Sequence, residues 1–186
     1  MKILAIFTCY NRKELTRQSI ETLRKNENVT FDYVIVNDGS TDGTAEMLEE
    51  QPDAIDVING DGGLFWNRGM YEAIEHTKKK HSDYEYYMLM NDDTKFVPGI
   101  FDEILPLLNN KKVLIGAIHG EDGKLSYGGI KYVKGIKYKK YGPEAQDVCF
   151  DTFNANCVIV PHDIFMEVSI DPYYQHSIGD FDYGLQ

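Results

Sequence analysis

The sequence predicts an α/β fold built around a mostly parallel sheet, and three observations predict it. Short apolar runs alternate with segments of helical periodicity over residues 1–110. Acidic turns follow two of these runs, at residues 37–42 and 91–94. After residue 110 the pattern changes to short segments rich in Tyr, Gly and Lys. Alternating strands and helices imply right-handed crossovers and parallel strands, and ligands of such sheets bind at the carboxyl ends of the strands.

Four apolar runs are the predicted parallel strands. Each is four or five residues long and bounded by polar turns, which is typical of a buried strand. They are residues 3–7, 33–36, 55–58 and 86–90.

Helices are expected after each of these strands. The first two cover residues 14–25 and 44–50, and Asp42 is placed to cap the second. The third is indicated by Met70, Ala73, Ile74 and Thr77, which fall at the helical i, i+3, i+4 and i+7 spacing. Pro98 suits the first turn of a fourth helix over residues 100–108.

The second half is expected to be smaller and antiparallel. Residues 113–118 are a predicted strand, followed by a hairpin turn at residues 121–124. Residues 157–160 are a last strand, stopped by Pro161. No closing helix is evident before Gln186, and this ending is interpreted as a cut inside a longer protein.

Five lysines lie between residues 131 and 140, interleaved with Tyr132 and Tyr138. A solvated face of a β-meander is the favoured interpretation. An acceptor-side lid and a patch facing anionic lipid are the alternatives.

Composition limits the classes of function. The net charge of −11 argues against nonspecific nucleic-acid binding, which needs a basic surface. Cys9, Cys149 and Cys157 lack metal-ligand spacing and predict a reduced, cytoplasmic protein without disulfides. No signal peptide is evident, and no apolar run approaches the roughly 20 residues of a membrane span.

The loop after the first strand contains Thr8, Tyr10 and Arg12. Tyr10 is placed to stack on a planar ring, and Arg12 could pair with phosphate or with an acidic neighbour. An ordinary capped loop between a strand and a helix is the alternative. Taken alone, this motif favours that alternative.

The acidic turn at residues 37–42 follows the second strand. The Asp38 carboxylate can accept from the imide N–H of uracil or thymine, or from ribose hydroxyls. The alternative is a helix N-cap, which explains Asp42 better than Asp38. A ligand-binding role is therefore favoured for Asp38.

Residues 59–69 contain three glycines, which permit close approach of a ligand to the backbone. Asn67 and Arg68 open a helix there, and a helix N-terminus favours anions. The pattern is not GxGxxG, so a dinucleotide fingerprint is not met. Trp66 is either a pocket wall or part of the core.

The fourth strand delivers Asn91, Asp92, Asp93 and Thr94. Hard oxygen ligands at a strand end suit Mg²⁺ or Mn²⁺ bridging a diphosphate. The alternative is a solvated acidic turn. Two adjacent carboxylates after an apolar strand favour the metal interpretation.

Asp180 and Asp182 near the end of the sequence share a face in a strand and diverge in a helix. Either could act as a general base. The alternative is a helix that begins with acidic residues in its first turn. His162 and His176 are interpreted as structural or exposed.

These motifs, in this order, resemble the family 2 glycosyltransferases, which have the GT-A fold of nucleotide-diphospho-sugar transferases. Residues 8–12 resemble the opening motif, residues 36–44 the second motif, and residues 91–93 the DxD metal motif. Residues 151–161 and 179–182 resemble the acceptor-side strand and the base-bearing motif, in a form similar to rhamnosyltransferase-like members. The resemblance implies a Rossmann-like, three-layer α/β/α fold with a mostly parallel central sheet and a small antiparallel acceptor-side part.

The resemblance also implies roles for individual residues. Tyr10 stacks on the base, Asp38 holds its imide edge, and Asp93 binds Mn²⁺ or Mg²⁺. Asn91 or Asp92 faces the ribose. The residues implied to bind the nucleotide are Thr8, Tyr10, Arg12, Asp38, Arg68, Asn91 and Asp92.

Asp180 is implied to be the base that deprotonates the acceptor, with Asp182 as the alternative. The sequence departs from the family pattern at four places. Asn91 replaces the first acid of the DxD motif, and Gly179 stands where an acid is common. Gln186 replaces a basic residue, and Asn67-Arg68 differs from the usual Arg-Asn pair.

The implied function is inverting transfer of a hexose or deoxyhexose from a UDP- or dTDP-linked donor to a saccharide or lipid-linked saccharide. The expected process is synthesis of a surface polysaccharide or glycolipid. A single domain is expected, with a nucleotide-binding half (1–110) and an acceptor-side half (111–186). It is placed in the cytoplasm, with the inner face of the membrane as a further expectation. A non-catalytic nucleotide-sugar-binding domain and a sugar nucleotidyltransferase are the alternatives.

Overall fold

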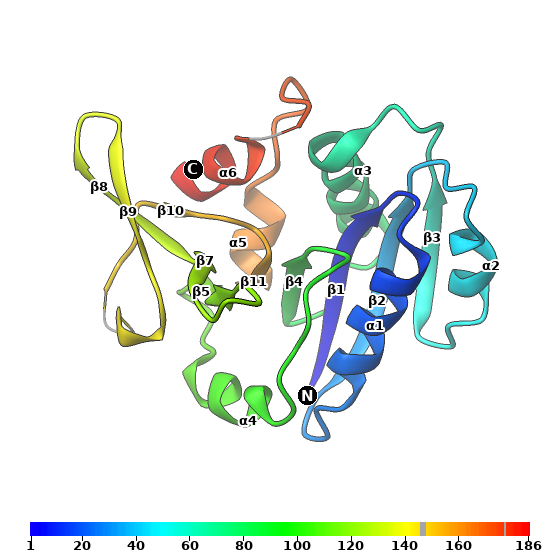
Figure 1. Cartoon of the computed structure of the whole chain (residues 1–186), viewed down its shortest axis with the longest axis horizontal. Coiled ribbons are helices and arrows are strands. Elements are labelled where there is room, and N and C mark those ends of the chain that lie inside the picture. The colour runs from blue at the N-terminus through cyan, green and yellow to red at the C-terminus, as the bar shows by residue number, and fades with distance from the viewer. Residues whose placement is uncertain (146–147, 177) are drawn as a thin grey trace.

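A six-stranded sheet forms the centre of the computed structural model, which describes residues 1–145, 148–176 and 178–186. The strand order is β3-β2-β1-β4-β11-β5 (Figure 1). The first four strands of the chain are parallel, whereas β11 is antiparallel to both of its neighbours. The strands are β1 (Lys2–Cys9), β2 (Thr30–Asn37), β3 (Ala54–Asn59), β4 (Tyr86–Met90), β5 (Leu114–Ile115) and β11 (Cys157–Pro161). The predicted mostly parallel sheet is confirmed.

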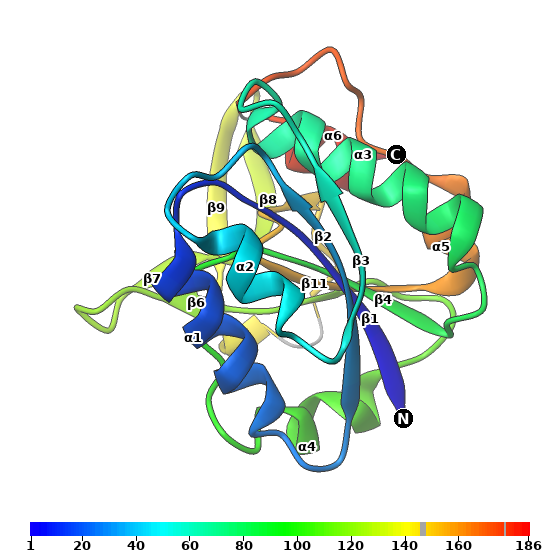
Figure 2. The ribbon, with the colours of Figure 1, turned by 90° about the vertical axis from the view of Figure 1, so that its right-hand side faces the viewer.

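Helices cover both faces of this sheet. One face carries α1 (Lys13–Arg24), α2 (Thr44–Glu49) and α4 (Ile100–Ile104). The other carries α3 (Phe65–Lys80), α5 (His162–Glu167) and α6 (Gly179–Leu185). Figure 2 shows α1 and α2 on one side of the strands and α3 and α5 on the other. The predicted three layers are therefore present.

Two apolar cores alternate along β1. Ile3, Ala5 and Phe7 belong to the core under α1, α2 and α4, whereas Leu4 and Ile6 belong to the core under α3. All five are fully buried. Successive strand residues point to opposite faces, so a strand covered on both sides needs an unbroken apolar run.

Two small antiparallel sheets lie beside the main one. β6 (Ile118–His119) pairs with β7 (Leu125–Tyr127) across the predicted hairpin turn. The other sheet has the order β10-β8-β9 and contains β8 (Gly129–Lys134), β9 (Lys137–Tyr141) and β10 (Thr152–Phe153). In Figure 1 the β8–β9 hairpin projects away from the main sheet. Two short 3-10 helices are Leu105–Leu107 and Pro143–Ala145.

The predicted strand at residues 113–118 is wrong as a single element. It divides into β5 and β6, because the chain leaves the sheet edge at Gly116. The Gly116 amide donates to the Cys157 carbonyl at 2.8 Å. A Cβ at Gly116 would lie 3.0 Å from the Cys157 side chain, so this close approach requires glycine.

Three helix predictions also need correction. The fourth helix ends at Ile104 rather than at residue 108, because Pro106 has no amide hydrogen to continue the α-helical bonding. The N-cap of α2 is Gly43, with φ of 86°, rather than Asp42. Asp42 instead accepts from the amides of Thr44, at 3.1 Å, and Lys13, at 2.9 Å. The chain also has the closing helix, α6, that was not expected from its sequence.

In the described part of the chain, every helix is too short or too polar to cross a membrane.

Candidate active site

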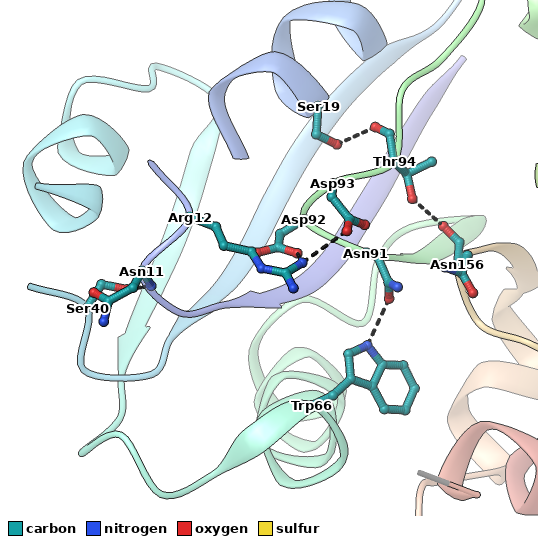
Figure 3. A network of polar contacts seen from close by, with 10 residues as sticks. All are labelled: Asn11, Arg12, Ser19, Ser40, Trp66, Asn91, Asp92, Asp93, Thr94 and Asn156. Carbon is teal, nitrogen blue, oxygen red and sulfur yellow. Dashed lines mark hydrogen bonds and ion pairs between the residues drawn. The ribbon is translucent and has the colours of Figure 1, made fainter. Parts of the chain in front are cut away.

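The carboxyl ends of β1, β2 and β4 bring three predicted motifs to one edge of the sheet. Cys9 at the end of β1 pairs in register with Asn37 at the end of β2. Asn11 then joins the two loops that follow. Its amide donates to Ser40 Oγ at 2.9 Å (Figure 3). Its side-chain oxygen accepts from the Thr41 amide at 2.7 Å. The loops are thus one unit.

Arg12 lies between the two carboxylates that follow β4. Its Nη1 donates to Asp92 Oδ1 at 3.3 Å and to Asp93 Oδ2 at 3.0 Å (Figure 3). The Asp92 side chain is 9% exposed and that of Asp93 42%. Burial raises the pKa of Asp92 to about 6, although the charge of Arg12 lowers it. The structure shows Arg12 paired with acidic neighbours, and its predicted contact with a phosphate stays a prediction.

The loop at residues 91–94 is held from three sides. Trp66 donates its indole N–H to Asn91 Oδ1 at 2.9 Å. Ser19 on α1 donates to the Thr94 carbonyl at 2.7 Å, and Thr94 Oγ1 donates to the Asn156 carbonyl at 2.9 Å. These bonds fix the direction in which Asp92 and Asp93 leave the sheet.

The Asp38 side chain is buried and accepts hydrogen bonds from the backbone of the loop that precedes α3. Its Oδ1 accepts from the Gly62 amide at 2.9 Å, and its Oδ2 accepts from the amides of Leu64 and Phe65 at 3.0 and 3.1 Å. An ionised carboxylate has about four acceptor positions, so one remains for a further donor. The carboxylate shapes this loop, and its predicted contact with a base stays a prediction.

Tyr10 is 52% exposed and lies at the open side of the same loop. A Cβ on Gly62 would lie 3.9 Å from the Tyr10 ring, so the two surfaces face each other. Thr8 is buried, and its hydroxyl donates to the Val36 carbonyl at 3.2 Å. Tyr10 is available to a ligand, whereas Thr8 supports the strand end.

The start of α3 is tied to the segment that precedes α6. Asn67 Nδ2 donates to the carbonyls of Asp171 and Tyr174, both at 2.8 Å. A Cβ on Gly179 would overlap the Asn67 side-chain oxygen, so only glycine fits where the family commonly has an acid. Arg68 is exposed, with Nε donating to the Pro172 carbonyl at 3.4 Å.

Asp180 and Asp182 lie in the first turn of α6, so they diverge. Asp180 Oδ2 accepts from Asn154 Nδ2 and from the Ala155 amide, both at 3.3 Å. Burial raises the pKa of Asp180, and these hydrogen bonds lower it. Asp182 instead accepts from Gln186 Nε2 at 3.2 Å.

Residues 154–156 contact both Asp180 and the loop at residues 91–94. Asn154 and Ala155 hold Asp180, whereas the Asn156 carbonyl accepts from Thr94 and from the Asn91 amide, the latter at 3.3 Å. The structure therefore brings the loop after β4 and the carboxylate of α6 to the same three-residue segment.

Comparison with known protein families identifies the family of this chain. The sequence profile of the family described as Glycosyl transferase family 2 matches residues 5–158. The chain belongs to this family. The predicted family, and with it the predicted class of enzyme, is confirmed. The rhamnosyltransferase-like branch stays a prediction.

A relative from Staphylococcus epidermidis is described as poly-beta-1,6-N-acetyl-D-glucosamine synthase. It is 34% identical over 89 residues, which are 48% of this chain and 21% of the relative. Among solved structures, S. aureus TarS 1-349 in complex with UDP aligns with 99% of this chain and 54% of its own, with a TM-score of 0.69 and 16% identity. The mannosyltransferase PcManGT from Pyrobaculum calidifontis, in complex with GDP-Man and Mn2+, aligns with 97% of this chain and 49% of its own, with a TM-score of 0.60 and 14% identity.

These solved structures confirm the predicted GT-A fold. The chain spans about half the length of the solved chains and about a fifth of the length of the curated relative.

The donor set after β4 fits the predicted cation of this glycosyltransferase domain. Asp92 and Asp93 offer carboxylate oxygens, the ligands that Mg²⁺ and Mn²⁺ prefer. Both carboxylates converge on the positive charge of Arg12. A place where two carboxylates share one cation therefore exists in the fold.

Sequence reasoning missed Ser19, Asn154 and Asn156 as supports of the site. Their polar groups act through tertiary contacts with residues 26 to 75 positions away. The one local signal was the match of residues 151–161 to the acceptor-side strand of the family.

The lysines of the β8–β9 hairpin are partly used within the protein. Lys131 Nζ donates to the Cys149 carbonyl and Lys140 Nζ to the Ser126 carbonyl, at 2.9 and 2.7 Å. Val133 and Ile136 are exposed beside them, at 71% and 93%. The lysines lie on an antiparallel hairpin, but the expected β-meander is wrong, because β10 pairs with β8 rather than with β9. The acceptor-side lid and the contact with lipid stay predictions.

Proposed function

We propose that this domain catalyses inverting, metal-dependent transfer of a sugar from a nucleoside-diphosphate-sugar to an acceptor hydroxyl. The observation that carries the proposal is the position of residues 154–156, which hold Asp180 on one side and the loop at 91–94 on the other. A base for the acceptor and a cation site for the leaving diphosphate are thus fixed to one support.

On the donor side, Tyr10 stacks on the base and Asp38 uses its remaining acceptor position for the imide N–H. Arg68 is exposed at the first turn of α3 and reaches the diphosphate. Asn91 is oriented toward the ribose by Trp66. The relevant donors are UDP- or dTDP-linked sugars, and the solved TarS structure with UDP supports a uracil-bearing donor.

Asp92 and Asp93 would hold Mn²⁺ or Mg²⁺, with Arg12 displaced from between them. An ion held there would supply positive charge against the charge of the leaving diphosphate. The solved PcManGT structure with GDP-Man and Mn2+ supports a divalent cation at such a site.

On the acceptor side, Asp180 takes the proton of the hydroxyl that attacks the anomeric carbon. Its raised pKa makes it a stronger base than an exposed aspartate. The hydroxyl oxygen forms the new bond on the face opposite the diphosphate, and the old bond leaves with its electron pair on the diphosphate. The configuration is therefore inverted, with oxocarbenium character in the transition state.

The acceptor is a growing saccharide or a lipid-linked saccharide in the synthesis of a surface polysaccharide or glycolipid. The relative described as poly-beta-1,6-N-acetyl-D-glucosamine synthase supports this class.

A thermal-shift screen of nucleotide sugars, with Mn²⁺ and with EDTA, identifies the donor, because a ligand that prefers the native state raises the melting temperature. Asp180→Asn then tests the mechanism. We expect full donor binding and a loss of transfer of about 10²-fold or more, whereas Asp182→Asn stays active. An active Asp180→Asn enzyme contradicts the assigned base, and donor binding without turnover in the wild type indicates a binding domain.

A further inference from the structure

Three side chains of types that commonly bind metal ions meet between β3 and the C-terminal end of α3, outside the proposed active site. His76 Nε2 lies 2.7 Å and His81 Nε2 lies 2.6 Å from the same oxygen, Asp56 Oδ2. The three donor atoms all lie within 4.8 Å of one another. Both imidazoles thus direct the same type of nitrogen at one carboxylate oxygen.

This cluster lies away from the donor site. The active-site end of α3 is its first turn, at Asn67, whereas His76 lies near the other end and His81 is the C-cap. At 1.5 Å per residue, these positions are about 14 and about 21 Å along the helix from Asn67. Ligands of the nucleotide site therefore do not explain the cluster.

Two imidazoles and one carboxylate match the ligand set of a transition-metal site. Zn²⁺ binds three protein ligands of this kind and completes a tetrahedron with water. Donor atoms around tetrahedral Zn²⁺ are about 3.3 Å apart for bonds of about 2.0–2.1 Å. The present separations of 2.6 and 2.7 Å need to open by less than about 1 Å, which side-chain rotation supplies.

The cluster is partly exposed, so solvent and ions can reach it. The side chains of His76 and His81 are each 22% exposed, and that of Asp56 is 31% exposed. An ion and its water can enter. Lys80 carries a positive charge near Asp56, which weakens the binding of a cation.

We propose that Asp56, His76 and His81 bind a divalent transition-metal cation, with Zn²⁺ as the best fit, and that the ion ties strand β3 to the end of α3. β3 is an edge strand whose one neighbour in the sheet is β2. A metal bond to His76 and His81 adds a cross-link between this strand and the helix layer.

The test is calorimetric titration with ZnCl₂ near pH 7.5 in an Asp93→Ala background, which removes the predicted Mn²⁺ ligand. We expect one saturable site and a melting temperature that rises with Zn²⁺ and falls back with EDTA. His76→Gln and His81→Gln are expected to weaken Zn²⁺ binding at least tenfold and to remove the thermal shift.

His119→Gln is the matched control, because His119 is an exposed histidine on β6 outside the cluster. It should bind Zn²⁺ as the parent does, and circular dichroism should show all variants folded. Equal Zn²⁺ affinity in the parent and in His76→Gln would overturn the proposal. Absence of saturable binding in the parent, with stability still lowered by His76→Gln, would reduce the cluster to an ion pair and overturn it as well.

Discussion

The two acidic loops at strand ends look alike in the sequence and differ in the structure. After β2, the Asp38 carboxylate is buried and accepts from three backbone amides. After β4, the Asp93 carboxylate is 42% exposed and contacts only a side chain, that of Arg12, among its described polar contacts. The first carboxylate is occupied mainly by its own loop and keeps one acceptor position, whereas the second is available to an incoming cation. Position at a strand end therefore does not decide a role, whereas the partners of the oxygens do.

The largest expected effect comes from removing the buried carboxylate. Asp38→Ala leaves the partly buried amides of Gly62, Leu64 and Phe65 without their acceptor, and unpaired donors away from water are costly. We expect the free energy of unfolding to fall by about 3 kcal/mol, measured by urea denaturation. Asp61→Ala is the control, because exposed Asp61 accepts only from Gly63 within the same loop. Equal stability of the two variants would break the comparison.

The second effect concerns the exposed loop and its cationic partner. Arg12→Met leaves Asp92 and Asp93 without their shared positive charge. Mn²⁺ affinity in the absence of nucleotide should rise about tenfold, or about 1.4 kcal/mol, as measured by titration calorimetry. Arg17→Met, which removes an exposed ion pair with Glu14 on α1, should leave it unchanged. Unchanged or weaker Mn²⁺ binding by Arg12→Met would show that Arg12 does not occupy the cation position.

A smaller effect is expected where α1 supports the loop at 91–94. Ser19→Ala removes the buried hydrogen bond to the Thr94 carbonyl. This should lower the free energy of unfolding by about 1 kcal/mol and weaken Mn²⁺-dependent donor binding. Exposed Ser82 is the matched position, and Ser82→Ala should change neither quantity. A neutral Ser19→Ala variant would mean that the loop holds its shape without α1.

The smallest expected effect is a shift in the pH dependence of the transfer rate. It concerns Asp180, the third carboxylate of the site. Transfer needs this carboxylate ionised, and burial raises its pKa. The rate should therefore fall as the pH falls through a value above the ordinary range of an aspartate. The pH profile of kcat/KM checks this, and Asp182→Asn should keep the same acid limb. An acid limb at the ordinary aspartate range would contradict the assignment.

The sequence predicts the parallel half well because its signals are local. The strands β1, β2 and β4 are buried on both faces and therefore read as apolar runs. The points at which a strand is interrupted are harder to predict from the sequence. The division of residues 113–118 depends on Gly116 approaching Cys157, which is 41 positions later.

The site shows the same division between local and tertiary information. Loop motifs indicated Asp38, Asp92, Asp93 and Asp180. The structure brings Asp180 and the loop that carries Asp92 and Asp93 to one segment, residues 154–156. That segment could not be found from local patterns, because Asn156 acts through its backbone carbonyl and its side chain carries no signal for that contact.

The most direct test of the account is calorimetry of the nucleoside diphosphate selected by the thermal screen, with Mn²⁺ and with EDTA, on the wild type and on Asp93→Ala. The account predicts tight binding that depends on Mn²⁺ in the wild type. It predicts weak binding with no Mn²⁺ dependence in the variant, with the melting temperature nearly unchanged because the side chain is half-exposed. Undiminished Mn²⁺-dependent affinity in Asp93→Ala would contradict the central claim that the loop after β4 holds the cation.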